Sequence, residues 1–493
     1  MAAAKSVLLA FLLSSFLAGT ALGKGYSTTR LSEGQQCRLR RIQSVQPNQR
    51  IESEGGLTEL WDYNDEQFEC AGVVACRNTL RQNSLFLPEF HNAPRLIYIE
   101  RGRGLLGITF PGCAETYHSD PSAGERRGGL ERLGGQSETE QSERRDQHQK
   151  VHRIRRGDII AIPEGAVHWC YNDGDEELVA ISVIDLNNQN NQLDERPRAF
   201  FLAGGFGGGE RGFRGQTEGR GGRFNYRNIF QGFDEHMLAE SYGVSPDLIR
   251  RMQSQNTDRG IMIQVRERMR VVAPEQDDEE FELEEEERFR RRRFNSEEDE
   301  AAARNGFEET FCTMKVRQNI EVRREAEVHS RQAGKLNLVN MHKMPILQYI
   351  DMSAERGRLN PRALYTPHWS ITDHRLVYVL RGNAHVQITD NNGENIFDER
   401  VNEGEMFVIP QFYTTVARAS NEGFEWVSFK TSGQPMKSPL AGYTSVLRAL
   451  PIEVIENAYE MSPREAMEVK FNRDHQTFLL SPSQQGGGVG RFD

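Results

Sequence analysis

The chain has 493 residues, of which 37% are hydrophobic, and a formal net charge of −11. A chain of this length normally folds into two or three domains, at roughly 150 residues each, and each domain can bury a sizeable core. The acidic balance argues against a general nucleic-acid-binding protein, because such proteins are usually basic.

Residues 1–23 are predicted to be a secretory signal peptide outside the fold. Lys5 precedes the apolar run SVLLAFLLSSFLA, and the small residues TALG follow it. This order is typical of a cleaved signal, and the run is shorter than the about 20 residues that a membrane span needs. We therefore expect a protein without a membrane segment after signal removal, in an oxidising compartment where disulfides form.

Six cysteines could form these disulfides. Six cysteines allow about 15 complete pairings, and their spacing alone does not choose among them. The absence of a Cys-x-x-Cys pair makes a zinc or thioredoxin-like site a poor interpretation. The cysteines are Cys37, Cys70, Cys76, Cys113, Cys170 and Cys312.

The sequence contains an internal repeat. RLIYIERGRGLLGIT, which begins at Arg95, matches RLVYVLRGNAHVQIT, which begins at Arg375, without a gap. Both segments alternate apolar and polar residues around a glycine, a pattern typical of a β-hairpin. GDIIAIPEGAVH from Gly157 likewise matches GEMFVIPQFYTT from Gly404, each with a turn glycine, an apolar strand and a proline that ends it.

A helical signal follows each set of strands. YGVSPDLIRRM near 242–252 matches YEMSPREAMEV near 459–469. Ser245 and Ser462 are predicted N-caps, and Pro246 and Pro463 stand at the first helical position. Each half is thus predicted to be a β-sandwich or barrel followed by helices.

Three polar inserts interrupt this repeat, at 118–150, 205–222 and 274–305. They contain too few apolar residues to offset the entropy of ordering, so we expect mobile loops. The RRRRF run in the last insert could suggest nucleic-acid binding. It lies beside an acidic run in a secreted chain, however, so we expect no nucleic-acid partner.

Residues 157–172, GDIIAIPEGAVHWCYN, resemble the second cupin motif, whose histidine binds the metal in metal-dependent cupins. That histidine corresponds to His168. Aligning His91 with the first histidine of the partner motif puts Ala93 and Tyr98 where another histidine and a glutamate would stand. Two ligands cannot form a site that normally needs three or more.

The second copy of this motif matches the metal-binding pattern even less well. His368 is followed by Ser370, and Thr415 stands where the ligand histidine would be. We therefore expect no metal or other cofactor and no enzymatic activity, with His91 and His168 as vestigial ligands.

Over essentially its whole length the chain resembles the legumin-type (11S) seed storage globulins of the bicupin superfamily, in their precursor form. The residues that carry the resemblance are the repeat, FLPEFHNAPRLIYIERGRG at 86–104 and NGFEETFC at 305–312. The resemblance implies a mainly β fold with two cupin (jelly-roll β-barrel) domains, at 24–273 and 306–493. Each would carry a helical arm, the two would be related by pseudo-twofold symmetry, and 274–305 would be a disordered linker.

The resemblance also implies how the protein is processed and assembled. An asparaginyl endopeptidase would cut between Asn305 and Gly306, although this pair could also form a tight turn. Disulfides would join Cys37 to Cys70 and Cys113 to Cys312, leaving Cys76 and Cys170 as free thiols. The precursor would form homotrimers in the endoplasmic reticulum, and the cut protein would form hexamers in the storage vacuole, as a nutrient reservoir of the seed.

Two other function classes stay open at this point. One barrel could bind a small molecule, a metal or a sugar, near His168 and Tyr98. Alternatively the chain could be a metal-dependent cupin oxidase or dioxygenase, although Ala93, Tyr98 and Thr415 argue against it.

Overall fold

The computed structural model describes residues 37, 39–115, 117–118, 147–193, 196–205, 227–254, 259–271, 312, 314–322, 326–473 and 478–482. Contacts divide the chain into Met1–Arg38, of which only Cys37 is described, and a unit from Leu39 to Asp493. The predicted signal peptide, most of 118–150 and 205–222, the linker 274–305 and Gly306 lie outside the described residues. Within the described part, no helix is both long and apolar enough to cross a membrane.

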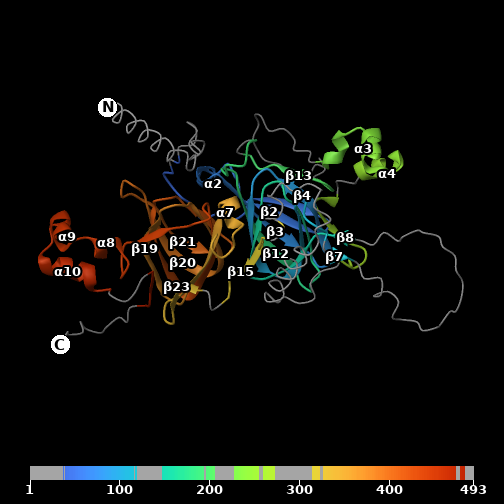
Figure 1. Ribbon diagram of the computed structural model, residues 1–493. Helices are drawn as coiled ribbons and strands as arrows, with labels where there is room; N and C mark the ends of the chain where they lie inside the picture. Colours follow the sequence, from blue (N-terminus) through green and yellow to red (C-terminus); the bar gives the residue numbers. More distant parts are fainter. Residues whose placement is uncertain are drawn as a thin grey trace, which may run out of the picture. The chain divides into compact units, whose positions relative to one another are not determined.

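The first half of the chain, drawn from blue to green in Figure 1, forms two antiparallel sheets together with the later strand β15, drawn yellow. Fully buried strands such as DIIAI at 158–162 hold the core between them. The seven-stranded sheet has the order β1 (Gln49–Ser53), β2 (Gly56–Leu60), β3 (Val73–Leu80), β12 (Leu178–Asp185), β5 (Arg95–Arg101), β10 (Asp158–Ile162) and β15 (Arg317–Asn319). The six-stranded sheet has the order β13 (Ala199–Phe201), β4 (Ser84–His91), β11 (Val167–Tyr171), β6 (Arg103–Thr109) and β9 (Val151–Arg155), with β14 (Met262–Gln264) also paired to β4. A separate short pair joins β7 (Tyr117–His118) to β8 (Gln147–His148).

The second half forms one ten-stranded antiparallel sheet, drawn from orange to red in Figure 1. Its main path runs through β16 (Ala326–Ser330), β17 (Gly334–Val339), β18 (Ser353–Leu359), β23 (Thr414–Lys430), β19 (Leu364–Ser370) and β24 (Lys437–Pro439). The remaining strands are β20 (Arg375–Thr389), β21 (Asn395–Asn402), β22 (Met406–Ile409) and β25 (Leu479–Leu480). The prediction of two β-barrel domains is confirmed.

The repeated segments are not the hairpins that their sequence suggests. β5 pairs with β10 and β12, whereas β6 pairs with β9 and β11, so the two strands lie in different sheets. Gly102 between them has a φ of +84°, which favours glycine, and a Cβ there would meet the carbonyl oxygen of Glu177. The glycine therefore bends one strand across the barrel edge. In the second copy β20 pairs with β22 before Gly382 and with β21 after it.

Helices follow each set of strands, as predicted. α4 (Pro246–Gln253) has Ser245 as N-cap, and α10 (Pro463–Phe471) begins with a complete capping box between Ser462 and Glu465. α4 follows α3 (Glu235–Tyr242), and α10 follows α9 (Ile452–Tyr459). The other helical elements are α2 (Glu66–Ala71), η3 (Ile229–Gly232), α7 (Leu347–Ile350) and α8 (Val446–Ala449).

The contacts between the two barrels are reciprocal. The Tyr98 hydroxyl lies 3.3 Å from Nε of Arg356, and the Tyr378 hydroxyl lies 3.4 Å from Nη1 of Arg77. Tyr98 and Tyr378 occupy the same place in the repeated segments, so each barrel offers its partner the same tyrosine–arginine contact. This reciprocity is what a pseudo-twofold relation requires.

Each barrel also receives a segment from the far side of the predicted cut site. β15, which follows residue 306, pairs with β10 of the first barrel. In the other direction, Val45 forms a bridge with Met406, and the Ile42 amide donates to the Ile396 carbonyl. The cut after residue 305 would therefore not separate the two barrels, because each of the two resulting chains would contribute segments to both barrels.

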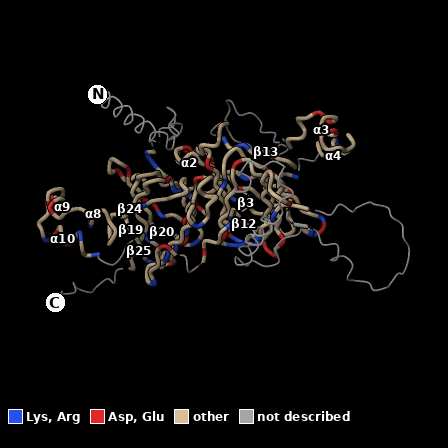
Figure 2. Tube along the Cα trace, viewed as in Figure 1, with Lys and Arg blue, Asp and Glu red and all other residues tan. Residues whose placement is uncertain are grey.

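Charged residues of both signs alternate over the two barrels. Figure 2 shows the Lys and Arg positions mixed with the Asp and Glu positions rather than gathered into one basic surface. Within the described residues, this mixture offers no continuous track for a phosphate backbone.

Candidate functional site

The histidine of the cupin-like motif lies in the first barrel, where β4, β5 and β11 contribute to one cluster. His168 on β11 lies opposite Glu89 on β4, because the two strands pair in that register. His91 follows two residues later on the same face of β4, and Arg95 begins β5. All four side chains are at most 9% exposed.

The Arg95 guanidinium lies among the other three groups. Its Nη2 is 2.5 Å from Nε2 of His91, and its Nη1 is 3.2 Å from Nε2 of His168 and 3.5 Å from Oε1 of Glu89. Nε2 of His91 also lies 2.8 Å from Oε1 of Glu89. One ring nitrogen cannot accept from the guanidinium and donate to the carboxylate together, so His91 serves one partner at a time.

The electrostatics keep the cluster neutral as a whole. Burial alone would raise the pKa of Glu89, but His91, Arg95 and His168 outweigh it and hold that pKa at about 2. Burial, with Arg95 beside the ring, lowers the pKa of His168 to about 3 and lowers the pKa of His91 as well. Near neutral pH the cluster thus holds one carboxylate, one guanidinium and two uncharged rings.

The site does not fit a divalent cation. Ligand atoms of Glu89, His91 and His168 lie within 4.8 Å of one another, and these are ligand types that transition metals prefer. However, the guanidinium, a permanent cation, is within reach of all three. Arg95 therefore supplies the positive charge that a metal would otherwise bring.

Ala93 and Tyr98, which the sequence alignment put at the missing ligand positions, do not lie in the cluster of His91 and His168. Ala93 is buried in a separate small cluster with Val74, Ile184 and Leu186. The Tyr98 hydroxyl contacts Arg356 and Glu321 between the barrels. The residues that complete the cluster are Glu89 and Arg95, which the sequence reasoning missed. The arginine that begins both repeated segments was the available signal.

The second barrel repeats the arginine–histidine contact. Nη1 of Arg375 lies 2.6 Å from Nε2 of His368, whose Nδ1 lies 2.7 Å from the Thr366 carbonyl oxygen. Burial, followed by the charge of Arg375, lowers the pKa of His368 well below its usual range. Thr415 lies opposite His368 in the sheet register and offers no imidazole.

Acidification should destabilise the protein through His168. An unfolded histidine titrates near 6.5, whereas His168 in the fold titrates at about 3. Between these values the unfolded state binds more protons, so this contribution is complete above about pH 6.5 and is lost as the pH falls towards 3. We expect wild type to lose up to about 1.4 kcal/mol per pH unit more than His168→Gln.

Denaturant unfolding at several pH values from 7 to 4 measures this difference. His91 and His152 have lowered pKa values too, so the comparison is between the slopes of the two proteins. Parallel curves would contradict a buried neutral ring at position 168.

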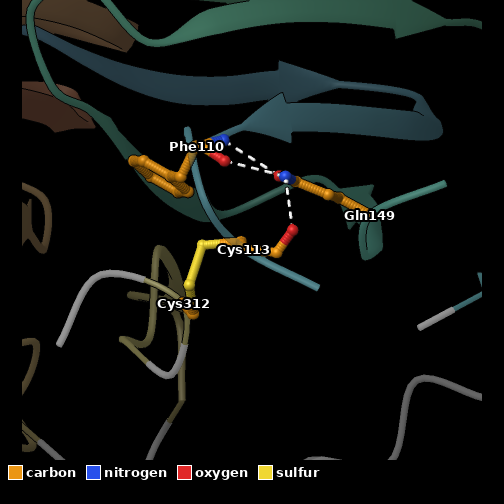
Figure 3. Close-up of a disulfide and its surroundings, with 4 residues drawn as sticks. All are labelled: Phe110, Cys113, Gln149 and Cys312. Atoms are coloured by element: carbon orange, nitrogen blue, oxygen red, sulfur yellow. Dashed lines mark hydrogen bonds between the residues drawn. A yellow bond between two sulfur atoms is a disulfide. The ribbon is translucent and has the colours of Figure 1, made fainter. Parts of the chain in front are cut away.

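A disulfide joins Cys113 to Cys312 across 199 residues of sequence (Figure 3). The Gln149 side chain supports the Cys113 side. Its Nε2 donates to the carbonyl oxygens of Phe110 and Cys113, at 2.7 and 3.0 Å, and its Oε1 accepts from the Phe110 amide at 2.9 Å. Cys312 lies six residues after Gly306 in the sequence, so this bond bridges the predicted cut.

The other four cysteines divide into two kinds. Cys76 and Cys170 are free thiols, and burial raises the pKa of both, that of Cys170 to about 12. Such thiols are poor nucleophiles at neutral pH. Cys37 and Cys70 are each disulfide-bonded.

The comparisons with known proteins agree with this geometry. The Cupin family model matches residues 43–205 and 320–467. The chain is 52% identical to 11S globulin seed storage protein 2 of Sesamum indicum, over 92% of this chain and 93% of the relative.

Solved structures give the same result. The structure of coconut allergen cocosin matches with a TM-score of 0.75 at 35% identity, over 91% of this chain and all of that one. Procruciferin, an 11S globulin from Brassica napus, matches with a TM-score of 0.75 at 33% identity, over 91% and 99%. The chain therefore belongs to the cupin family and, within it, to the 11S globulins, which are seed storage proteins and not enzymes.

Proposed function

We propose that this storage protein is made as a precursor, which an asparaginyl endopeptidase cuts between Asn305 and Gly306. The observation that carries the proposal is the Cys113–Cys312 disulfide, because it joins the two chains that the cut would create. Covalent connection thereby survives the loss of one peptide bond. Cys37 and Cys70, which we propose as partners, both lie in the longer chain and would not add a tether.

Non-covalent contacts support the same arrangement. Arg317 of β15 forms an ion pair of 3.2 Å with Asp158, and Nδ2 of Asn319 donates to the same carboxylate at 2.9 Å. Asp158 is fully buried. In the other direction, the Val408 amide donates to the Gln67 side chain of the longer chain at 3.1 Å. The shorter chain is thus held at both barrels.

The helical arms are the proposed contacts in a homotrimer, two of which would stack as a hexamer after the cut. Each arm exposes apolar side chains that a soluble monomer would be expected to cover. A ring of three could pair the first arm of one protomer with the second arm of the next. The exposed residues are Met237, Tyr242, Val244 and Leu248 on the first arm and Val454, Tyr459, Met467, Val469 and Phe471 on the second.

The proposed route is passage through the endoplasmic reticulum to the protein storage vacuole of the seed. Compact barrels would resist digestion during storage, and from the polar composition of 274–305 we expect a peptide that the endopeptidase can reach. Precursor treated with this endopeptidase should run as one band on a denaturing gel without reductant and as two bands with it. A single band under both conditions would contradict the cut.

Cys113→Ser should uncouple the two chains only under denaturing conditions. After cleavage this variant should run as two bands without reductant, because the one proposed bond between the chains is gone. Its native mass, measured by light scattering, should match the cut wild type, because β15 and the segment near Val45 still cross between barrels.

Cys170→Ser is the matched control, because Cys170 is a free thiol in the same barrel. It should run as one band without reductant. One band from cut Cys113→Ser would mean that a different bond joins the chains, and separation of its chains in native buffer would refute the non-covalent contacts.

A further inference from the structure

The second barrel contains a small interior cavity of about 30 Å³. One water molecule needs about 10–15 Å³ measured in this way, so the space holds roughly two waters or one ion of similar size. Its lining combines polar groups with apolar residues of β20, β22 and β23. The polar lining consists of Glu355, Tyr365, His368, Arg375, Thr415 and Ser428.

Two of these groups have hydrogen-bonding atoms without a partner. Arg375 is 3% exposed, and its Nη1 contacts His368, but its Nε and Nη2 have no partner. Ser428 is 2% exposed, and its hydroxyl has no partner either. Buried polar atoms are normally satisfied, so three such atoms around one cavity point to a missing occupant.

The described charged groups that interact with one another beside the cavity are three cations, Lys430, Lys437 and Arg375, and two carboxylates, Asp373 and Glu355. Lys437 pairs with Glu355 at 2.6 Å, and Lys430 pairs with Asp373 at 3.5 Å. Arg375 interacts electrostatically with Glu355 and Lys430, but it forms no ion pair of its own among the described residues. His368 is uncharged, because burial and Arg375 lower its pKa.

The first barrel differs in this respect. There Arg95, the counterpart of Arg375 in the repeat, lies 3.5 Å from the Glu89 carboxylate. A buried charge is stable when it is paired. Among the described residues, no carboxylate forms an ion pair with Arg375, because Glu355 is paired with Lys437 and Asp373 with Lys430.

We propose that the cavity of the second barrel binds one small monovalent anion, of the class of formate or chloride, through Arg375 and Ser428. The Nε and Nη2 hydrogens lie along one edge of a guanidinium and match the two oxygens of a carboxylate. The Ser428 hydroxyl supplies a third donor. Glu355 also lines the cavity, but Lys437 neutralises it. The volume admits an ion of about three heavy atoms and excludes larger organic acids.

Equilibrium dialysis of the full-length protein tests the site, with carbon-14 formate in one arm and chlorine-36 chloride in the other. We expect saturable binding of one ion per protomer in at least one arm, and the arm that binds identifies a carboxylate or a halide as the occupant. Saturable binding in neither arm would overturn the proposal, since the cavity would then hold only water.

Ser428→Ala should weaken the binding by about tenfold or more, because it removes one hydrogen bond to a charged ligand. Ser182→Ala is the matched control, because Ser182 is buried to 1% exposure in the first barrel, away from the cavity. It should leave the affinity unchanged. Ala417→Leu should abolish binding, because Ala417 lines the cavity and a larger side chain would fill it. Equal binding by wild type and both cavity variants would place the ion elsewhere and refute the site.

Discussion

Arg95→Ala is expected to lower the free energy of unfolding by about 3–5 kcal/mol, the usual result of removing one partner from a buried ion pair. Glu89 would lose Arg95, the one permanent cation that pairs with it among the described residues, while remaining 2% exposed between two imidazole rings. The space left by the guanidinium would also be lined by three potential metal ligands. We therefore expect zinc to bind the variant and to restore part of the lost stability, because ligands that bind the native state stabilise it.

Denaturant unfolding with zinc and with a chelator measures both effects. Wild type should not respond to zinc at this site, because Arg95 supplies the cation. Arg95→Ala/His168→Gln is the control, because it keeps the space but removes one ligand and should lose the response. Equal stabilisation of all three proteins by zinc would show that the metal binds elsewhere, and an unchanged stability of Arg95→Ala would refute the ion pair.

Asn305→Ala should leave the precursor uncut under conditions in which the endopeptidase converts all of the wild type. The enzyme requires an asparagine side chain before the cut bond, and alanine lacks the amide. We expect one chain on a reducing gel. We also expect the variant to stop at the trimer, because we infer that cleavage frees the linker from a trimer face and exposes apolar surface for stacking.

The chain supplies a matched control in a second Asn-Gly pair, Asn392-Gly393. This pair lies in the turn between β20 and β21, where Oδ1 of Asp390 accepts from the amides of Asn392 and Glu394, each at 2.9 Å. A peptide held in a tight turn is not extended for a protease. Asn392→Ala should therefore leave the cleavage pattern unchanged. Sedimentation measures the assembly of uncut Asn305→Ala. If this variant formed hexamers as readily as wild type, the coupling between cleavage and assembly would be disproved.

Local features of the fold could be predicted well from the sequence. Ser462 caps α10 through its hydroxyl, whereas Ser245 occupies the N-cap position of α4 without a side-chain cap hydrogen bond. Both signals come from residues that are neighbours along the chain, so they can be recognised without the tertiary structure. The strands β10 and β22 were recognisable for the same reason, each with a turn glycine before it and a proline after it.

The site depended on contacts that run across the sheets. Spacing along one strand led to Ala93 and Tyr98, whereas the register of β4 against β11 brings Glu89 to His168. The sequence pattern of 95–109 matched a hairpin, because alternation does not reveal whether a strand returns on itself or bends into a second sheet. The positive φ of Gly102 bends the chain between β5 and β6, so that the two strands enter different sheets.

By itself the sequence determined the internal repeat, the two β-barrels with their helical arms and the resemblance to 11S globulins. Periodicity, turn residues and motif spacing are all properties of neighbouring residues, so they can be recognised along the chain. Only the tertiary structure decided that Arg95 serves as the internal cation and that Arg375 forms no ion pair with any described residue. Charge balance in a buried cluster depends on groups from different strands, which the sequence separates and the barrel brings together.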